Sequence, residues 1–241
     1  MIVYFPGCMA TYRAQDIAKS TMDLLRKAGV EFTLLGEDEW CCGSVMLRTG
    51  NTDAAEELKE HNIAAFKEAG ADTVITSCAG CFRTLGTDYG KLTGEQDYEV
   101  RHILEFIKDL ISQGKLKFPK TGKKVTYHDP CHLGRHSGMY EVPREVLTSV
   151  PGLELVEMER NRENARCCGA GGGVSSAFKD LSNRMADARL KDAEETGAEV
   201  LTSACPFCTH QLRQAAERNG SKMKVVDITE LLRGIMQSAE A

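Results

Sequence analysis

The ten cysteines of this 241-residue chain follow one spacing pattern that occurs twice. Each copy has a single cysteine, then an adjacent cysteine pair followed by glycine, then a C-x-x-C motif. The steps between successive cysteines are 33, 1, 36 and 3 in the first copy and 36, 1, 37 and 3 in the second. The first copy comprises Cys8, Cys41, Cys42, Cys78 and Cys81, and the second comprises Cys131, Cys167, Cys168, Cys205 and Cys208. Internal repetition of this kind indicates a duplicated domain.

The predicted secondary structure repeats in the same order as the cysteines. Short apolar runs predict strands at 2–5, 31–35, 73–76, 123–127, 153–157 and 199–202. Amphipathic patterns with polar starts and glycine stops predict helices at 16–28, from 52 or 53 to 69, from about 143, and at 175–195. Strands that alternate with crossover helices predict an α/β fold. We expect two duplicated Rossmann-like domains with mostly parallel sheets and pseudo-twofold symmetry.

The predicted domains are 1–118 and 119–241, joined through a lysine-rich linker at 115–124. In each domain the cysteine groups directly follow a predicted strand or precede a predicted helix. Open parallel sheets bind ligands beyond the carboxyl ends of their strands. Three loops of each half are therefore expected to converge on one site, despite sequence separations of more than thirty residues.

Composition restricts the classes of function. Apolar residues make up 42% of the chain and charged residues 27%, which is typical of a folded globular protein. The net charge of −5 argues against a broad nucleic-acid-binding surface. No apolar run approaches the ~20 residues of a bilayer-spanning helix, so no direct membrane span is expected. The N-terminal residues do not resemble a signal peptide, and we predict a cytoplasmic chain whose only membrane association is through a partner.

Four kinds of cysteine chemistry compete to explain five thiols per copy. Disulfides are disfavoured because a bridge between adjacent cysteines is strained and because the cytosol keeps thiols reduced. A thioredoxin-like C-x-x-C pair would leave three thiols unused in each half. Structural zinc in one or both halves stays open, although zinc sites usually take four ligands from two short pairs. Iron–sulfur clusters fit best, since soft thiolates bind them and a cluster with several irons can use more than four.

The spacing C-x2-C-x2-C-x3-C-P of bacterial ferredoxins does not occur in this chain. Over essentially the whole chain, the two copies instead resemble the cysteine-rich CCG domain of heterodisulfide reductases and related iron–sulfur oxidoreductases. The resemblance includes Phe5-Pro6-Gly7-Cys8, Cys41-Cys42-Gly43-Ser44, the run from Tyr127 to Arg135, and Cys167-Cys168-Gly169 with the glycine-rich residues 170–173. The context is most similar to the catalytic region of the D-type subunit and is also similar to the B-type subunit.

The resemblance implies one noncubane [4Fe-4S] cluster per complete five-cysteine copy, with a disulfide cleaved between the two clusters. Disulfide reduction takes two electrons, and two facing clusters can each supply one. The implied activity is that of an oxidoreductase acting on a sulfur group, with a mixed disulfide such as CoM-S-S-CoB as substrate. Relatives that have lost a cysteine hold zinc or nothing in that half, whereas both copies are complete here.

Two other functions stay open. One is a non-catalytic electron relay in a lactate-, glycolate- or glycerol-3-phosphate-type oxidoreductase or a quinone-linked complex, and the other is a zinc-stabilised assembly scaffold. The resemblance also implies partners, because no flavin, nicotinamide or ferredoxin motif is found in the sequence. The expected partners are a ferredoxin-like iron–sulfur subunit and, upstream of it, a flavoprotein, a hydrogenase, a formate dehydrogenase or a membrane cytochrome.

Several charged or polar residues near the cysteines are further candidates. His128, His132 and His136 lie around Cys131, where a histidine could donate a proton or hydrogen-bond a sulfur, and His132 is the preferred catalytic candidate. Arg13 and Arg135 follow the two single cysteines at nearly matching distances. They could balance cluster charge or bind an anionic thiol, or they could be solvated arginines at helix starts.

Glycines and one aromatic residue complete the candidates. Gly43, Gly169 and Gly171 are predicted to let the backbone approach the clusters. A G-x-G-x-x-G nucleotide loop would need glycine at position 174, where Val174 stands, so a flexible loop is preferred over a phosphate site. Trp40, the only tryptophan, is expected to shield the first cluster from water.

Overall fold

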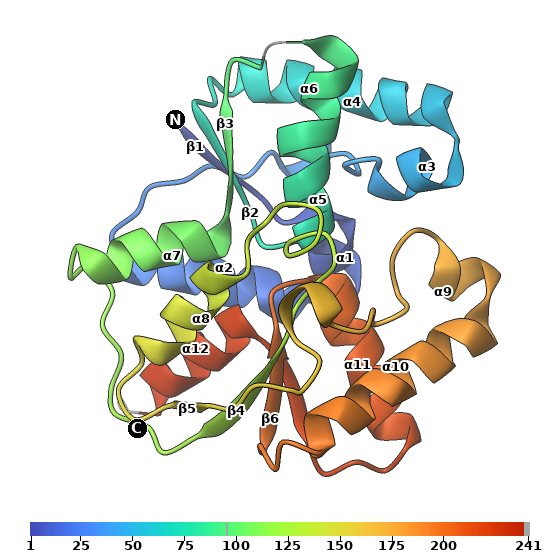
Figure 1. Cartoon of the computed structure of the whole chain (residues 1–241). Coiled ribbons are helices and arrows are strands. Elements are labelled where there is room, and N and C mark those ends of the chain that lie inside the picture. The colour runs from blue at the N-terminus through green and yellow to red at the C-terminus, as the bar shows by residue number, and fades with distance from the viewer. Residues whose placement is uncertain (95, 239–241) are drawn as a thin grey trace.

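The computed structural model describes residues 1–94 and 96–238, and within them the strands form two separate parallel sheets. The first sheet has the order β1-β2-β3, with β1 (Ile2–Phe5), β2 (Thr73–Thr76) and β3 (Glu99–His102). The second has the order β5-β4-β6-β7, with β4 (Lys124–His128), β5 (Glu154–Leu155), β6 (Val200–Ser203) and β7 (Lys224–Asp227). Figure 1 shows the first sheet in the upper part of the molecule and the second in the lower part. The predicted α/β class, with two repeats and parallel sheets, is confirmed.

Helices cover both sheets. Those of the first half are α1 (Gly7–Tyr12), α2 (Gln15–Lys27), α3 (Ser44–Thr49), α4 (Thr52–Glu68), α5 (Ala79–Arg83), α6 (Tyr89–Thr93) and α7 (Ile103–Ser112). Those of the second half are α8 (Glu141–Thr148), α9 (Val174–Ala177), α10 (Lys179–Glu194), α11 (Pro206–Arg218) and α12 (Ile228–Gln237). Short 3₁₀ turns lie at Gly36–Asp38 and Arg162–Asn164, and a π turn at Thr84–Asp88 follows α5.

The predicted strand at 31–35 is wrong. Only Thr33 pairs there, through a single parallel bridge to Val3. The chain leaves the sheet edge because Glu31 and Leu34 are exposed, and a 3₁₀ turn begins at Gly36 with a φ of 63°. The equivalent segment of the second half keeps two strand residues, in β5, in place of the predicted 153–157.

The predicted helix at 175–195 is two helices. Phe178 ends α9 and precedes α10, and its backbone angles (φ −135°, ψ 62°) lie outside the helical region, so the axis breaks there. The predicted linker at 115–124 is partly interior, because Leu116 and Phe118 are buried and Lys124 already belongs to β4. The sequence patterns did not predict β3, β7, α7 or α12.

Helices of the two halves pack against each other where the halves meet. Helix α2 packs against α12 of the other half, and α7 packs against α8. An ion pair accompanies each contact: Arg233 bonds Asp23 at 2.7 Å, and Lys108 bonds Glu145. In each pair the acid lies on α2 or α8 and the base on the last helix of the other half, α12 or α7, so the two contacts involve corresponding helices of the repeat. The boundary at 118/119 stays a prediction.

The last helix of each half begins with the same capping arrangement. The side chain of His102 accepts a hydrogen bond from the Leu104 amide, and Glu105 accepts one from the His102 amide. Asp227 and Glu230 do the same at the start of α12. Each capping box satisfies amides that would otherwise be unpaired, and it fixes the chain where β3 and β7 end.

Candidate functional site

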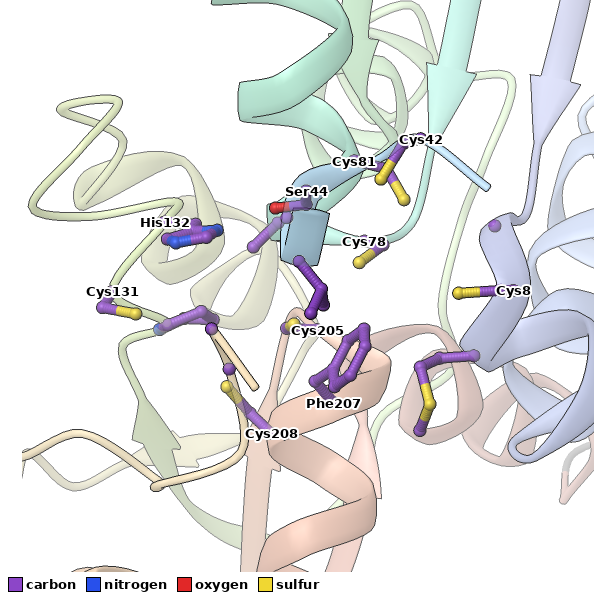
Figure 2. Close-up of a pocket in the computed structure, with 18 of the residues that line it drawn as sticks. Cys8, Cys42, Ser44, Cys78, Cys81, Cys131, His132, Cys205, Phe207 and Cys208 are labelled. Carbon is purple, nitrogen blue, oxygen red and sulfur yellow. The ribbon is translucent and has the colours of Figure 1, made fainter. Parts of the chain in front are cut away.

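A cavity lies where the two halves meet, and nine of the ten cysteines line it, Cys167 being the exception. Figure 2 shows Cys8, Cys78 and Cys81 on one side of this cavity and Cys131, Cys205 and Cys208 on the other. The remaining lining residues are Pro6, Gly7, Met9, Ser44, Val45, Ala79, Gly80, Pro130, His132, Gly171, Gly172 and Phe207. The two cysteine sets therefore face one shared space.

Strand register explains this convergence. Phe5 of β1 pairs with Thr76 of β2, so Cys8 at the start of α1 and Cys78 just before α5 both follow their strands at one edge of the sheet. His128 of β4 pairs with Ser203 of β6, which does the same for Cys131 and Cys205. Both are carboxyl edges of parallel strands, where open α/β sheets bind ligands.

The sulfurs of each half form the same chain of contacts. In the first half, Cys8 Sγ and Cys41 Sγ are 3.8 Å apart, and successive thiols in the order Cys41, Cys42, Cys81 and Cys78 shift each other's pKa values. In the second half the same order of neighbours is Cys131, Cys167, Cys168, Cys208 and Cys205, and the Cys168–Cys208 distance is 3.2 Å. Cys78 and Cys205 also shift each other's pKa, so the two sets are close together at these two thiols.

These contacts shift the thiol pKa values in opposite directions. Hydrogen bonds from Cys42 and Cys8 lower the pKa of Cys41 to about 3, and those from Cys131 and Cys168 lower the pKa of Cys167 to about 2. The bond with Cys41 raises the pKa of Cys42 to about 12. Ionising one thiol therefore hinders its neighbours, and five touching thiols become five thiolates only with a cation to offset their charge. The donor set fits a metal centre that carries several positive charges.

Backbone geometry keeps the sulfurs accessible. Gly7 precedes Cys8 with a φ of 76°, and a Cβ at this position would lie 2.7 Å from Cys81 Sγ. Gly169 has a φ of 81°, and its amide donates a hydrogen bond to Cys167 Sγ at 3.3 Å. Gly43 holds the matching position before α3, and Gly171 lines the cavity with open space around it. Any side chain at Gly7 would displace a candidate ligand.

Among the predicted histidines, His132 lines the cavity and contacts the ring of the exposed His136 edge-on, with ring centroids 5.4 Å apart. Burial lowers the pKa of His132 to about 4, so its ring is neutral at pH 7. His128 does not line the cavity and is 1% exposed behind the second cysteine set. The structure thus brings only one of the three histidines to the cavity wall.

The predicted arginines and tryptophan lie outside the cavity. Arg13 is exposed, and Arg135 donates hydrogen bonds to the carbonyls of Glu163 and Ala165, which fixes the loop that leads to Cys167. Trp40 is 41% exposed and stacks on His61 with 3.7 Å between ring centroids.

Sequence reasoning missed several residues of the site. Ser44, Val45 and Phe207 line the cavity, and only their adjacency to the cysteine motifs could have indicated this. Arg189, fully buried on α10, contacts His128, and no local pattern distinguishes it from the solvated arginines of the same helix.

No disulfide joins any of the ten cysteines, all of which lie in the described part of the chain. Two α/β repeats with five thiols each, nine of which line one shared cavity, define a class of cysteine-rich, metal-binding proteins. The family described as "Cysteine-rich domain" (CCG) matches residues 2–86 and 125–213, and the chain belongs to this family. Membership implies iron–sulfur clusters as the cofactor, which agrees with the donor set.

Three relatives indicate the range of the family. The D-type subunit of the dihydromethanophenazine:CoB--CoM heterodisulfide reductase of Methanosarcina acetivorans is 50% identical over 96% of this chain and 58% of its own length. The B-type subunit of the fumarate reductase (CoM/CoB) of Methanothermobacter marburgensis is 39% identical over 96% of this chain and 45% of its own length. "EtfAB:quinone oxidoreductase" of Syntrophomonas wolfei is 36% identical over 95% and 33%. The chain thus spans about half the length of such relatives, or less.

A solved structure shares the fold. The crystal structure of a hypothetical protein from Helicobacter pylori has a TM-score of 0.71 and 10% identity, and the match covers 98% of this chain and 48% of that one. Among the helices of the described residues, none combines the length and apolar composition needed to cross a bilayer.

Proposed function

We propose that this chain is the catalytic iron–sulfur part of a heterodisulfide reductase-like enzyme that reduces a mixed disulfide to two thiols. The domains 1–118 and 119–241 would each hold one noncubane [4Fe-4S] cluster through their five cysteines. The observation that best supports this proposal is the shared cavity, which cysteines of both sets line and in which Cys205 raises the pKa of Cys78. A substrate with two sulfurs needs such a two-sided site.

The protein's own residues have separate tasks in this proposal. When bound, two clusters would supply the two electrons of disulfide cleavage, one each. Apolar residues in the cavity wall, among them Met9, Val45 and Phe207, exclude water and contact the carbon chains of the substrate. His132 presents a neutral ring in the same wall, where it would hydrogen-bond the substrate.

A second function, an electron relay, is favoured by one observation on this chain and one on its relatives. Cys41 and Cys167 are half-buried, and Cys167 faces a separate surface pocket beside Arg166 and Arg184. Relatives at 36–39% identity are named as a quinone oxidoreductase and a fumarate reductase component. In a relay, electrons would pass through the two cysteine sets to a partner without disulfide chemistry.

Partner proteins follow from either function. Relatives are named as subunits, so we propose a ferredoxin-like iron–sulfur subunit and, upstream of it, a flavoprotein, a hydrogenase, a formate dehydrogenase or a membrane cytochrome. Zinc in one half is the alternative to a second cluster, and an iron count separates the two.

The test combines metal content with a choice of electron acceptor. The anaerobically purified chain should contain about eight irons with matching sulfide. A mixed disulfide should oxidise a pre-reduced dye when this iron-loaded chain is present and not when it is absent. Phe207→Ala should raise KM for the disulfide with iron content unchanged, whereas Phe178→Ala, on a side chain 63% exposed and outside the cavity lining, should change neither. Full iron loading with oxidation by a quinone but not by a disulfide would establish the relay, and zinc alone would refute both functions.

A further inference from the structure

A buried histidine and a buried arginine form a fixed pair behind the second cysteine set. His128 ends β4 with 1% exposure, and Arg189 on α10 is completely buried. Arg189 Nε donates a hydrogen bond to His128 Nδ1 at 2.9 Å, and Arg189 Nη1 donates to the Arg160 carbonyl at 2.7 Å. A guanidinium has no acceptor, so Nδ1 must be the unprotonated nitrogen of the ring. The proton of the neutral imidazole is therefore on Nε2.

The Nε2–H of His128 lies beside candidate cluster ligands. It has no hydrogen-bond partner in the described protein, although it is buried. A ring nitrogen of His128, Cys168 Sγ and Cys208 Sγ all lie within 4.8 Å of one another, and Arg189 occupies Nδ1. An N–H that is buried without an acceptor destabilises the fold, because it has lost its hydrogen bond to water. Sulfur is the acceptor available to this donor.

The first cysteine set has no such pair at the matching positions, although His102 at the end of β3 is a buried histidine whose Nε2 also has no hydrogen-bond partner among the described residues. Under the repeat, Phe5 matches His128 with the same offset of 123 positions that relates Cys8 to Cys131. Asn62 matches Arg189 with the offset of 127 positions that relates Cys78 to Cys205. Phe5 packs edge-on against Phe66, and the amide of Asn62 donates to the Cys41 carbonyl and to Tyr89 Oη. At these two positions the first half therefore lacks both the imidazole and the guanidinium that orients it.

We propose that His128 donates its Nε2–H to sulfur at the second cysteine set and thereby raises the reduction potential of that centre above the potential of the first. The proposal rests on the iron–sulfur loading proposed above. A hydrogen bond to sulfur stabilises the more negative, reduced state, and donors of this kind tune iron–sulfur potentials. The buried guanidinium of Arg189 acts as a positioning group because it fixes the tautomer and the orientation of the ring. An electron that enters the chain would then settle at the second set.

The test is a redox titration of the loaded protein, followed by electron paramagnetic resonance. His128→Phe installs the residue found in the first half and should lower one of the two midpoint potentials while the other stays in place. A tenfold change in the ratio of oxidised to reduced centre corresponds to about 59 mV for one electron. His61→Phe, the same exchange on the half-buried side chain that stacks on Trp40 outside the cavity lining, should move neither potential.

The unmodified protein supplies a second readout that needs no variant to fold. With ¹⁵N-labelled histidine, the paramagnetic centre should show a weakly coupled nitrogen and a coupled proton that exchanges in D₂O. The strong coupling of a directly bound nitrogen would overturn the proposal, because His128 would then be a ligand. Unchanged potentials in fully loaded His128→Phe would also overturn it, but would leave the proposed function intact, whereas an iron-free native chain would refute that function as well.

Discussion

Cys78 and Cys205 belong to different halves of the chain, yet both line the shared cavity, where Cys205 raises the pKa of the Cys78 thiol and Cys208, together with Cys78, lowers the pKa of Cys205. Each is the first cysteine of a C-x-x-C motif that follows the strand next to β1 or β4 in its sheet. The two candidate metal centres are therefore neighbours within one site, and their ligands should nevertheless be separable by mutation.

The first prediction concerns this separability. Cys42→Ala removes the thiol that links Cys41 to Cys81 and should reduce the iron content by about half, while the second set stays loaded. Cys168→Ala at the matching position should remove the other half. Iron and sulfide analysis with paramagnetic resonance measures both. Two intact centres in Cys42→Ala would show that the five-cysteine assignment is wrong.

The second prediction concerns Gly7. An alanine here would place Cβ 2.7 Å from Cys81 Sγ at a φ of 76°, so Gly7→Ala should cost roughly 1–3 kcal/mol of stability and deplete iron at the first set. Gly70→Ala is the matched control, because its φ is 64° and no atom lies within 4 Å of the added Cβ. It should carry only the backbone penalty, with iron retained. Equal iron in both variants would contradict the steric argument.

The third prediction concerns the packing of α12 where the two halves meet. Leu232 is fully buried on α12, the helix that packs against α2 of the other half. Leu232→Ala should therefore lower the free energy of unfolding by about 2–5 kcal/mol. Arg233→Met, which removes only the partly exposed ion pair to Asp23, should cost about 1 kcal/mol or less. Thermal unfolding of both variants gives the comparison, and a larger loss in Arg233→Met would reverse the ranking of the two effects.

The fourth prediction concerns pH. Burial raises the pKa of Asp227 to about 8, so the folded state holds this proton more tightly than the unfolded state, in which the pKa is 3.8. The stabilisation from this shift is fully present below pH 4, and it is lost as the pH rises toward 8, because the folded state keeps its proton while the unfolded state has already lost it. The free energy of unfolding should therefore fall from pH 4 to pH 8. Asp227→Asn keeps an acceptor for the Thr229 amide and lacks this titration. Its stability relative to the native chain should therefore increase by more than about 1 kcal/mol from pH 5 to pH 8, as chemical denaturation would show; a constant difference would contradict the shift.

The repeated cysteine spacing predicts two α/β halves because strands and cysteines alternate in a fixed order, and both sheets are parallel as predicted. The pattern fails at β3 and β7, whose sequences Glu-Val-Arg-His and Lys-Val-Val-Asp are too charged to resemble buried strands. The predicted strand at 31–35 is wrong because an apolar run does not show whether a segment will pair with the edge strand of a sheet. Most lining positions follow from adjacency to the cysteines.

The pair formed by His128 and Arg189 could not be predicted in this way. Arg189 lies among charged residues on α10, and burial alone distinguishes it from them. For Arg135 the sequence suggested more than the structure shows, because its position beside a cysteine motif suggested a role at the cluster. The structure instead shows it bonded to the carbonyls of the loop before Cys167.

The packing of helices between the halves has a consequence for their origin. One repeat alone would expose the faces that α2 and α7 bury, and a second identical copy would cover both in the manner of a twofold-symmetric dimer. This chain is the covalent form of such a dimer. Identical subunits must place the same residue on both sides of their axis, whereas a fused pair can place phenylalanine at one copy of a position and histidine at the other. Gene fusion thus allows two equivalent metal centres to become a donor and an acceptor.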